Sequence, residues 1–457
     1  MKKYDAIIIG FGKGGKTLAG FLGNKGYKVA LIEKSKDMYG GTCINVGCIP
    51  TKILVEESQK FKYKNLLNFE SKQVEFKKAI ETKDTIVSKL REANYNKLNS
   101  IQNVDIFDGE GSFETENKIK INYGETSEVI FGDKIFINTG AKTVVPSIQG
   151  LRNTKNVYDS TSIMNLKTLP KKLAIIGGGY IGLEFASIFN NFGSEVSIIE
   201  GNKDILLREE PEVREEIKGD FSKRGINILS GTKVISMKNN DSDQNQVEIS
   251  IEVDGKLEVA IFDSVLVAVG RKPNVENLSL ENAGINYSDR GIEVNEFLET
   301  NIKNIYALGD VKGGLQFTYI SLDDFRIVAN QLFGDKTLST KTRKVIPYSV
   351  FISPTLSKVG LSEKEAIENG YEIKTNVLKS AQIPRAKILQ EERGVLKVVV
   401  EKESDKILGA TLYSVESSEV INIIALAIKE EKKSSYLKDF IFTHPTMSEA
   451  LNDLFLL

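Results

Sequence analysis

Residues 6–15 read AIIIGFGKGG, and residues 173–182 read LAIIGGGYIG. In both stretches a short, continuously apolar run precedes glycines in the pattern G-x-G-x-x-G, as in the first turn of a dinucleotide-binding βαβ unit. A helix-like stretch and a second apolar run follow, ending at Glu33 and at Glu200. The first glycine and the terminal acid are 23 positions apart in each unit (33 − 10 and 200 − 177). The sequence therefore predicts an α/β protein with two Rossmann-like dinucleotide-binding domains.

The glycines and the acid have separate tasks in such a unit. Glycines permit a tight turn and let a pyrophosphate approach a helix N-terminus, and the acid accepts hydrogen bonds from a ribose. An acid at Glu200 favours the free 2′-hydroxyl of NADH over the phosphate of NADPH, although Lys203 and Arg208 lie nearby and keep NADPH open. The expected ligand contacts are Gly10, Gly12, Gly15 and Glu33 in the first unit, and Gly177, Gly179, Gly182 and Glu200 in the second.

Residues 40–52, GGTCINVGCIPTK, hold both cysteines of the 457-residue chain, Cys43 and Cys48. Residues five apart in an ideal helix rise by about 7.5 Å, beyond the roughly 7 Å Cα limit of a disulfide, so pairing needs a distorted turn. Gly47 and Pro50 are suited to making one. Because so short a loop removes little unfolded-chain entropy, a redox-active pair is a better interpretation than a structural staple.

Two other interpretations of the cysteines are weaker. Inert buried thiols are typical of scattered positions, whereas these lie in one glycine-rich turn. A structural zinc site usually needs four Cys or His ligands, and the chain has two cysteines and one histidine, so we expect no metal site.

Composition narrows the partners. With 61 basic and 62 acidic residues, the chain has no overall charge that would attract nucleic acid or an anionic membrane. The N-terminal apolar run is short and is preceded directly by the charged Asp5. This pattern is typical of a first β-strand rather than of a signal peptide. No apolar stretch approaches the roughly 18 residues of a membrane span. We expect a cytoplasmic protein.

A chain of this length should divide into several domains. We expect a first dinucleotide-binding domain over residues 1–145, a second over 146–270, a return to the first over 271–344, and an α+β domain without glycine fingerprints over 345–457. Turns that follow apolar strands supply further ligand contacts. They are Thr139 and Gly140 in the first domain, Gly270 where the chain crosses back, and Gly309 and Asp310 in the return segment.

Together, a redox-active cysteine pair and two dinucleotide sites suggest an electron relay. Hydride donors do not efficiently reduce disulfides directly, and a flavin is the usual intermediary. Since the cysteines follow the first unit, we expect FAD there and NADH or NADPH in the second.

The whole chain resembles the flavin-dependent pyridine nucleotide-disulfide oxidoreductases, the class of dihydrolipoamide dehydrogenase, glutathione reductase and mercuric reductase. The cysteine segment, both glycine fingerprints, Gly309-Asp310 and residues 444–449 fall in the family order. The resemblance implies a homodimer with a C-terminal dimerisation domain. It also implies a thiolate at Cys48 against the flavin, an interchange thiol at Cys43 that meets substrate, and an ion pair of Lys52 and Glu184 beside the reactive flavin nitrogen. Further implied roles are Glu33 on the FAD adenosine ribose, Asp310 on the ribityl chain, and His444, oriented by Glu449, as acid/base reaching Cys43 from the other subunit.

Within this class, the single cysteine pair excludes mercuric reductases of the usual type, which need a second pair. Residues 309–324, 347–351 and 383–386 resemble the bacterial reactive-chlorine-resistance reductases, a branch associated with reduction of hypothiocyanous acid and of copper(II). Phe317 and Tyr319 either narrow the substrate entrance or pack against the flavin domain. The alternatives are a dihydrolipoamide dehydrogenase and a flavoprotein redox sensor that does not turn over.

Overall fold

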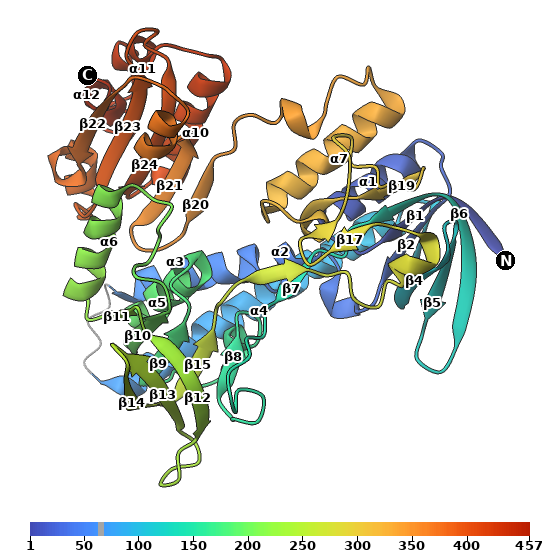
Figure 1. The fold of residues 1–457 in the computed structure, drawn as a ribbon, viewed down its shortest axis with the longest axis horizontal. Coiled ribbons are helices and arrows are strands. Elements are labelled where there is room, and N and C mark those ends of the chain that lie inside the picture. Colours follow the sequence, from blue (N-terminus) through green and yellow to red (C-terminus); the bar gives the residue numbers. More distant parts are fainter. Residues whose placement is uncertain (63–67) are drawn as a thin grey trace.

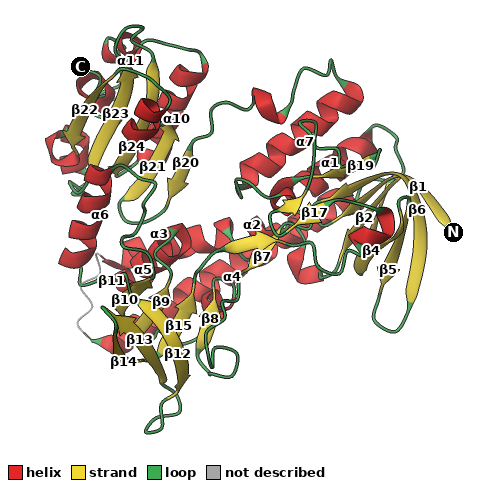
Figure 2. Cartoon of the chain, in the orientation of Figure 1, coloured by secondary structure: helices red, strands yellow, loops and turns green. Residues whose placement is uncertain are grey.

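The computed structural model describes residues 1–62 and 68–457. The chain forms three lobes, each built around its own sheet (Figures 1 and 2). The first lobe contains the N-terminus, the second lies in the middle of the chain, and the third contains the C-terminus. The α/β fold class with an additional α+β domain is confirmed.

The first lobe combines two distant parts of the chain in one sheet. Parallel pairing runs from β3 through β2 and β1 to β6, and β19 of the return segment pairs with the C-terminal part of β6. The N-terminal part of β6 pairs antiparallel with β5, which carries β4. At the centre of the sheet, β2 and the second half of β1 are buried and almost entirely apolar, as expected for parallel strands covered on both faces. The strands are β1 (Lys2–Ile9), β2 (Val29–Glu33), β3 (Val104–Asp108), β4 (Glu110–Thr115), β5 (Lys118–Asn122), β6 (Ser127–Ile137) and β19 (Ile305–Ala307), covered by α1 (Lys13–Asn24) and α7 (Thr318–Phe333).

The second lobe repeats the arrangement of the first. Its strands are all parallel in the order β11, β10, β9, β15, β8, and β9 is joined to β10 by α5 as β1 is joined to β2 by α1. This confirms the predicted pair of βαβ units. The elements are β8 (Val157–Asp159), β9 (Lys172–Ile176), α5 (Tyr180–Phe192), β10 (Glu195–Glu200), α6 (Pro211–Lys223), β11 (Asn227–Ser230) and β15 (Ser264–Val267), with an antiparallel sheet of β12 (Lys233–Asn239), β13 (Val247–Val253) and β14 (Lys256–Phe262).

The third lobe is an antiparallel sheet with short helices. Its strand order is β20, β21, β24, β23, β22, and α10 packs on β21 and β24. The elements are β20 (Tyr348–Val350), β21 (Thr355–Gly360), α8 (Glu363–Glu368), β22 (Ile373–Lys379), α9 (Pro384–Ile388), β23 (Val395–Glu401), β24 (Ile407–Ser414), α10 (Ser417–Lys429), α11 (Ser434–Lys438) and α12 (Ala450–Leu454).

Helices and a strand crossing connect the first two lobes. The short α2 (Thr42–Asn45), α3 (Cys48–Lys62) and the long α4 (Phe69–Asn99) follow β2, and α3 packs against α5 of the second lobe. The chain leaves the first lobe at β7 (Ala141–Thr143) and returns at β16 (Arg271–Pro273), and these strands pair antiparallel. A further hairpin of the return segment joins β17 (Tyr287–Ser288) to β18 (Gly291–Ile292). We retain 1–145, 146–270, 271–344 and 345–457 as our proposed domain division.

Candidate functional site

A cavity of about 1860 Å³ lies where the lobes meet. Its lining includes both glycine loops, both cysteines, the start of α7 and residues of α10. A pocket for one drug-sized ligand spans roughly 300–1,000 Å³, so this cavity is larger than such a ligand needs. Predicted site residues on its wall are Gly10, Gly12, Glu33, Cys43, Cys48, Lys52, Thr139, Gly140, Gly177, Gly179, Glu184, Glu200, Gly270 and Asp310, whereas Gly15, Gly182, Gly309, His444 and Glu449 do not line it.

Close packing accounts for the position of the last glycine in each loop. A Cβ at Gly15 would lie 2.6 Å from the carbonyl oxygen of Gly10, and one at Gly182 would lie 2.0 Å from that of Gly177. The first glycines also have φ of +104° and +111°, which side-chain-bearing residues rarely adopt. Gly15 and Gly182 therefore let the helix approach the turn, and their contact is with protein rather than with the cavity.

The N-termini of α1 and α5 both lie at the cavity wall. Neither α1 nor α5 has a side-chain N-cap or an acidic residue in its first turn, so neither satisfies its own terminal N–H groups in that way. A Cβ at Gly179 would meet nothing within 4 Å, so the loop of the second unit is open at its middle glycine. At α5 these features match the donor-rich, uncapped helix start that binds a diphosphate. At α1 the backbone N–H groups of Gly14 and Gly15 already donate to Ser321 and Asn138.

The two terminal acids have the same partner in both units. The carboxylate Oε2 of Glu33 accepts a hydrogen bond of 3.0 Å from the backbone N–H of Phe11, and Oε2 of Glu200 accepts one of 2.6 Å from Gly178. Burial raises the pKa of Glu33. Each acid thus ties the end of the second strand to the glycine loop, in addition to the ribose contact that the sequence predicts.

The cysteine segment begins in contact with the first glycine loop. A Cβ at Gly41 would lie 2.7 Å from Cα of Gly12. Cys43 lies in α2 and Cys48 is the first residue of α3, and the helices are separated at Val46 and Gly47. The distorted turn that the sequence predicts is present, and both cysteines are free thiols. Pro50 plays no part in the break, since it lies within the first turn of α3, where its missing N–H costs nothing.

The electrostatics of the pair favour a thiolate at Cys48. A hydrogen bond from the Cys43 thiol, the hydroxyl of Thr318 and the charge of Lys52 together lower the pKa of Cys48 to about 6, against the opposing effect of burial. The same contact with Cys48 raises the pKa of Cys43 well above its usual range, and burial adds to that rise. Cys48 also stands at a helix N-terminus, which stabilises an anion.

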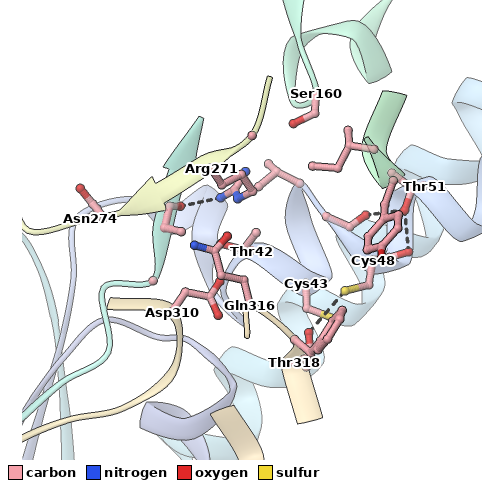
Figure 3. Close-up of a pocket in the computed structure, with 18 of the residues that line it drawn as sticks. Thr42, Cys43, Cys48, Thr51, Ser160, Arg271, Asn274, Asp310, Gln316 and Thr318 are labelled. Carbon is pink, nitrogen blue, oxygen red and sulfur yellow. Dashed lines mark hydrogen bonds between the residues drawn. The ribbon is translucent and has the colours of Figure 1, made fainter. Parts of the chain in front are cut away.

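Thr318 is a site residue that the sequence reasoning missed. It is the first residue of α7, and its Oγ1 lies 3.3 Å from Sγ of Cys48 (Figure 3). Its neighbours Phe317 and Tyr319 are aromatic, and an aromatic pair indicates packing or a narrowed entrance. A threonine between them carries no pattern of its own, and only the packing of the return segment reveals its contact.

Lys52 and Glu184 are in direct contact. Lys52 Nζ donates to both carboxylate oxygens of Glu184, at 2.9 and 2.8 Å. Glu184, from α5, also accepts a hydrogen bond of 2.8 Å from the backbone N–H of Phe351, and Nζ lies 4.7 Å from the centre of the Phe351 ring. Lys52 is four residues after Cys48, so one turn of α3 brings the cation near the thiol.

Two further side chains organise the first ligand site. Asn138 accepts a 2.8 Å hydrogen bond from Gly15 N–H and donates one of 2.6 Å to the carbonyl of Leu308, which ties the glycine loop to the return segment. Arg271 donates to the carbonyl of Ala141 across the crossing strands and lines the cavity (Figure 3). Burial raises the pKa of Asp310, and the charge of Arg271 opposes that rise. The sequence reasoning assigned neither Asn138 nor Arg271 a role.

His444 and Glu449 pair on the surface of the third lobe. The imidazole Nδ1 lies 2.8 Å from Oε2 of Glu449, and the His444 side chain is 73% exposed. Apolar side chains lie exposed beside it, including Phe440 and Ile441, the latter 92% exposed.

The aromatic residues at the cavity stack on one another. The ring centres of Phe317 and Tyr319 are 5.2 Å apart with planes inclined by 13°, and Phe317 stacks in the same way on Tyr348 at 6.0 Å and 14°. The Tyr319 hydroxyl donates to the carbonyl of Pro347 at 2.6 Å. Since all of these residues line the cavity, the packing and entrance interpretations of Phe317 and Tyr319 are compatible.

The described residues contain neither a cluster of metal-ligating side chains nor a membrane-spanning helix. Across residues 1–62 and 68–457, no group of three or more His, Cys, Asp and Glu side chains is arranged to hold a metal ion. In the same residues, no helix is both long and apolar enough to cross a membrane.

Comparison with known families identifies the class. Residues 4–324 match the model of the pyridine nucleotide-disulphide oxidoreductases, and residues 346–455 match that family's dimerisation domain. The chain belongs to this family of enzymes, whose cofactors are FAD and NAD(P)H.

Individual relatives place the chain more finely. It is 46% identical over 456 residues to a probable pyridine nucleotide-disulfide oxidoreductase, RclA, of Escherichia coli, covering 100% of this chain and 99% of the relative. A mercuric reductase of Staphylococcus aureus is 34% identical, with 98% and 81% covered, and a dihydrolipoyl dehydrogenase of the same species is 34% identical, with 97% and 94% covered. The structure of a Cu(II) complex of the HOCl-induced flavoprotein disulfide reductase RclA matches with a TM-score of 0.93 and 45% identity, covering 100% of this chain and 99% of that one.

Proposed function

We propose that this enzyme uses NAD(P)H, with NADH preferred, to reduce hypothiocyanous acid at the Cys43–Cys48 pair in defence against reactive chlorine species. The observation that carries the proposal is that one cavity contains both glycine loops and both thiols. Support for a role in defence against reactive chlorine comes from the E. coli relative, which is an HOCl-induced flavoprotein disulfide reductase. Copper(II), present in two structures of that relative, is the second candidate acceptor.

The chain's own residues define where the cofactors would bind. FAD would lie along Gly10 and Gly12, with Glu33 at its adenosine ribose and Asp310 at its ribityl chain, while NAD(P)H would lie along the open loop at Gly179. When bound, FAD supplies the conversion of hydride from NAD(P)H into the electron pair that reduces a disulfide. Of the two basic residues beside Glu200, Arg208 lines the cavity, so Arg208 is the one placed to weaken the preference for NADH.

The dithiol can reduce hypothiocyanous acid in two displacements. The Cys43 thiolate attacks the sulfur of HOSCN, which forms a Cys43–S–SCN bond and releases hydroxide, neutralised to water by a proton. The Cys48 thiolate then attacks the Cys43 sulfur, forms the disulfide and expels thiocyanate. In sum, two thiols and HOSCN give one disulfide, water, thiocyanate and a proton. Because the resting negative charge lies on Cys48, Cys43 needs a base before it can attack.

We propose that His444 of a second subunit is this base. Glu449 holds the imidazole Nδ1, which leaves the other ring nitrogen free to accept the Cys43 proton. His444 does not line the cavity of its own chain, and the exposed Phe440 and Ile441 beside it lie in the segment that matches the dimerisation domain. A homodimer would cover these apolar side chains and bring the imidazole to the partner's Cys43.

A mixed-dimer experiment tests this arrangement. Homodimers of Cys43→Ser and of His444→Ala should both turn over slowly, whereas a dimer with one subunit of each kind contains one intact Cys43–His444 pair. Such mixed dimers should regain about half of the native rate per dimer, because one of two sites is complete. Mixed dimers no faster than the average of the two mutant homodimers would refute a histidine shared across subunits.

The acceptor is tested by offering hypothiocyanous acid, lipoamide and copper(II) separately and following NADH oxidation by stopped flow. Rapid sustained turnover with hypothiocyanous acid and little with lipoamide is the expected result. Fast turnover with lipoamide alone would make the protein a dihydrolipoamide dehydrogenase. Oxidation of the thiols without NADH-supported turnover would instead identify a redox sensor.

We also propose a cytoplasmic location, because a dithiol that works as a reductant needs a reducing compartment with NADH.

A further inference from the structure

Lys16 is a charged residue at the cysteine segment to which the proposed mechanism gives no role. It lies in α1, and its Nζ donates hydrogen bonds to Oδ1 of Asn94 at 2.5 Å and to the carbonyl of Gly40 at 3.4 Å. Gly40 opens the tight turn that leads into α2 and Cys43. Asn94 is itself held, because its amide nitrogen donates to the carbonyl of Leu90 at 2.6 Å. The ammonium is therefore fixed at the start of the segment that carries the outer thiol.

The charge of a different lysine favours the thiolate form of each cysteine. The charge of Lys16 lowers the pKa of Cys43, and the charge of Lys52 lowers that of Cys48. The two lysines differ in what neutralises them. Lys52 forms an ion pair with Glu184, whereas no carboxylate within residues 1–62 and 68–457 lies within 4 Å of Lys16 Nζ. The field of Lys16 at Cys43 is thus not cancelled by a salt bridge.

Burial disfavours the charged form of Lys16, and its hydrogen bonds to Asn94 and Gly40 offset this effect only in part. Burial and the neighbouring charges of Lys13 and Lys97 lower the pKa of Lys16 to about 8, and Cys43 opposes that fall. Lys16 is nonetheless mostly protonated at neutral pH. An unpaired, partly buried cation is unfavourable for folding alone, so a functional reason for its position is worth testing.

We propose that Lys16 is a positioning residue that stabilises the thiolate form of Cys43. The inference rests on the proposed redox role of the cysteine pair and is independent of the acceptor's identity. When the proton leaves Cys43, a second negative charge develops beside the Cys48 thiolate, and the two sulfurs repel each other. The ammonium of Lys16 attracts this second charge and so favours the state in which Cys43 can attack. No electron or atom is transferred to Lys16.

Alkylation of the dithiol holoenzyme tests the proposal without any acceptor. The FAD-loaded protein is reduced with dithiothreitol, freed of the reductant under nitrogen, and treated at pH 7 with iodoacetamide, which is uncharged. Mass spectrometry of the peptides then gives separate rates for Cys43 and Cys48. The variants are Lys16→Met, Lys16→Gln, which keeps a donor for Asn94 but loses the charge, and Lys16→Arg, which keeps the charge. Lys89→Met, exposed on α4, is the control for loss of one positive charge.

We expect Cys43 to react about tenfold more slowly in Lys16→Met and Lys16→Gln, since one nearby cation shifts a pKa by about one unit. Cys48 should stay within about twofold, and Lys16→Arg and Lys89→Met should resemble the native protein in this comparison.

Three outcomes would overturn the proposal. A Cys43 rate within twofold of native in both neutral variants would show that the charge has no effect. An equal loss in Lys16→Arg would assign the effect to packing. Equal slowing of both cysteines would indicate a disturbed segment rather than a specific effect on Cys43. The acceptor comparison distinguishes these failures from failure of the proposed function, because it is performed on the native protein.

Discussion

Replacing Thr318 with valine removes one hydroxyl from the thiol pair and leaves the shape of the side chain almost unchanged. Thr318 Oγ1 lies 3.3 Å from Sγ of Cys48, whose pKa is lowered to about 6. A hydrogen bond to a charged group contributes about 1.5–3 kcal/mol. The distance is long and Cys48 is exposed to the cavity, so we take the lower end, which corresponds to a pKa shift of about one unit.

The expected result is a pKa of about 7 for Cys48 in Thr318→Val. At pH 6 the thiolate fraction would then fall from about one half to about one tenth, so alkylation of Cys48 should slow about fivefold, while rates above pH 8 should agree. The assay is the pH profile of iodoacetamide alkylation of the reduced protein, with the two cysteine peptides quantified separately. Thr318→Ser keeps the hydroxyl and should retain the native profile.

A displacement of the Thr318→Val profile by less than about 0.3 pH units, or toward lower pH, would refute the reasoning. One pKa unit corresponds to about 1.4 kcal/mol, so such a displacement would mean that the hydroxyl contributes less than about 0.4 kcal/mol. The same displacement in Thr318→Ser would show that packing of the α7 N-terminus matters, and that the hydroxyl does not.

Three other predictions follow from the site. In the native protein, the alkylation rate of Cys48 should rise about tenfold per pH unit below pH 6 and level off above about pH 7, because its lowered pKa keeps the thiol ionised there. A rate profile with its midpoint near pH 8.5, as in a free thiol, would contradict this prediction. Gly182→Ala should lower the free energy of unfolding in urea by about 3 kcal/mol, because its Cβ would overlap the Gly177 carbonyl. Gly179→Ala should change that free energy by less than about 0.5 kcal/mol and should mainly weaken NADH binding. Equal stabilities of the two variants would contradict the packing argument. Lys52→Met leaves the Glu184 carboxylate without its cation and should lower the free energy of unfolding in urea by about 2 kcal/mol. The loss should be smaller than for a fully buried ion pair, because Lys52 is partly exposed. A double variant that also carries Glu184→Gln should recover part of that loss.

Local sequence patterns predicted much of the fold. The apolar runs, glycines and terminal acids of the two βαβ units act over about two dozen residues, so spacing in the chain translates directly into spacing in the structure. In both units the first glycine and the terminal acid are equally far apart in the chain. In the structure each acid accepts a hydrogen bond from the residue that follows that glycine, Glu33 from Phe11 and Glu200 from Gly178. Pro50, by contrast, was given a part in the turn between the cysteines that the structure does not support, because a proline in the first turn of a helix leaves the helix intact.

Resemblance to a family predicted contacts that no local pattern contains. Lys52 and Glu184 belong to different lobes, and their pairing was expected only because the chain looked like known reductases. The structure puts the two side chains within 2.9 Å of each other. For His444 the single chain shows the tether to Glu449 and the exposure of the ring, and the link to Cys43 remains our proposal.

The sequence by itself determined the two dinucleotide-binding units, the placing of both thiols in one distorted turn and the separate C-terminal domain, because each depends on residues close together in the chain. The tertiary structure decided which thiol carries the charge. Thr318 approaches Cys48 from the return segment, and Lys16 reaches the Cys43 segment from α1 with the help of α4. Such contacts depend on how whole elements pack, and a pKa responds to every charge and hydrogen bond within a few ångströms regardless of position in the chain.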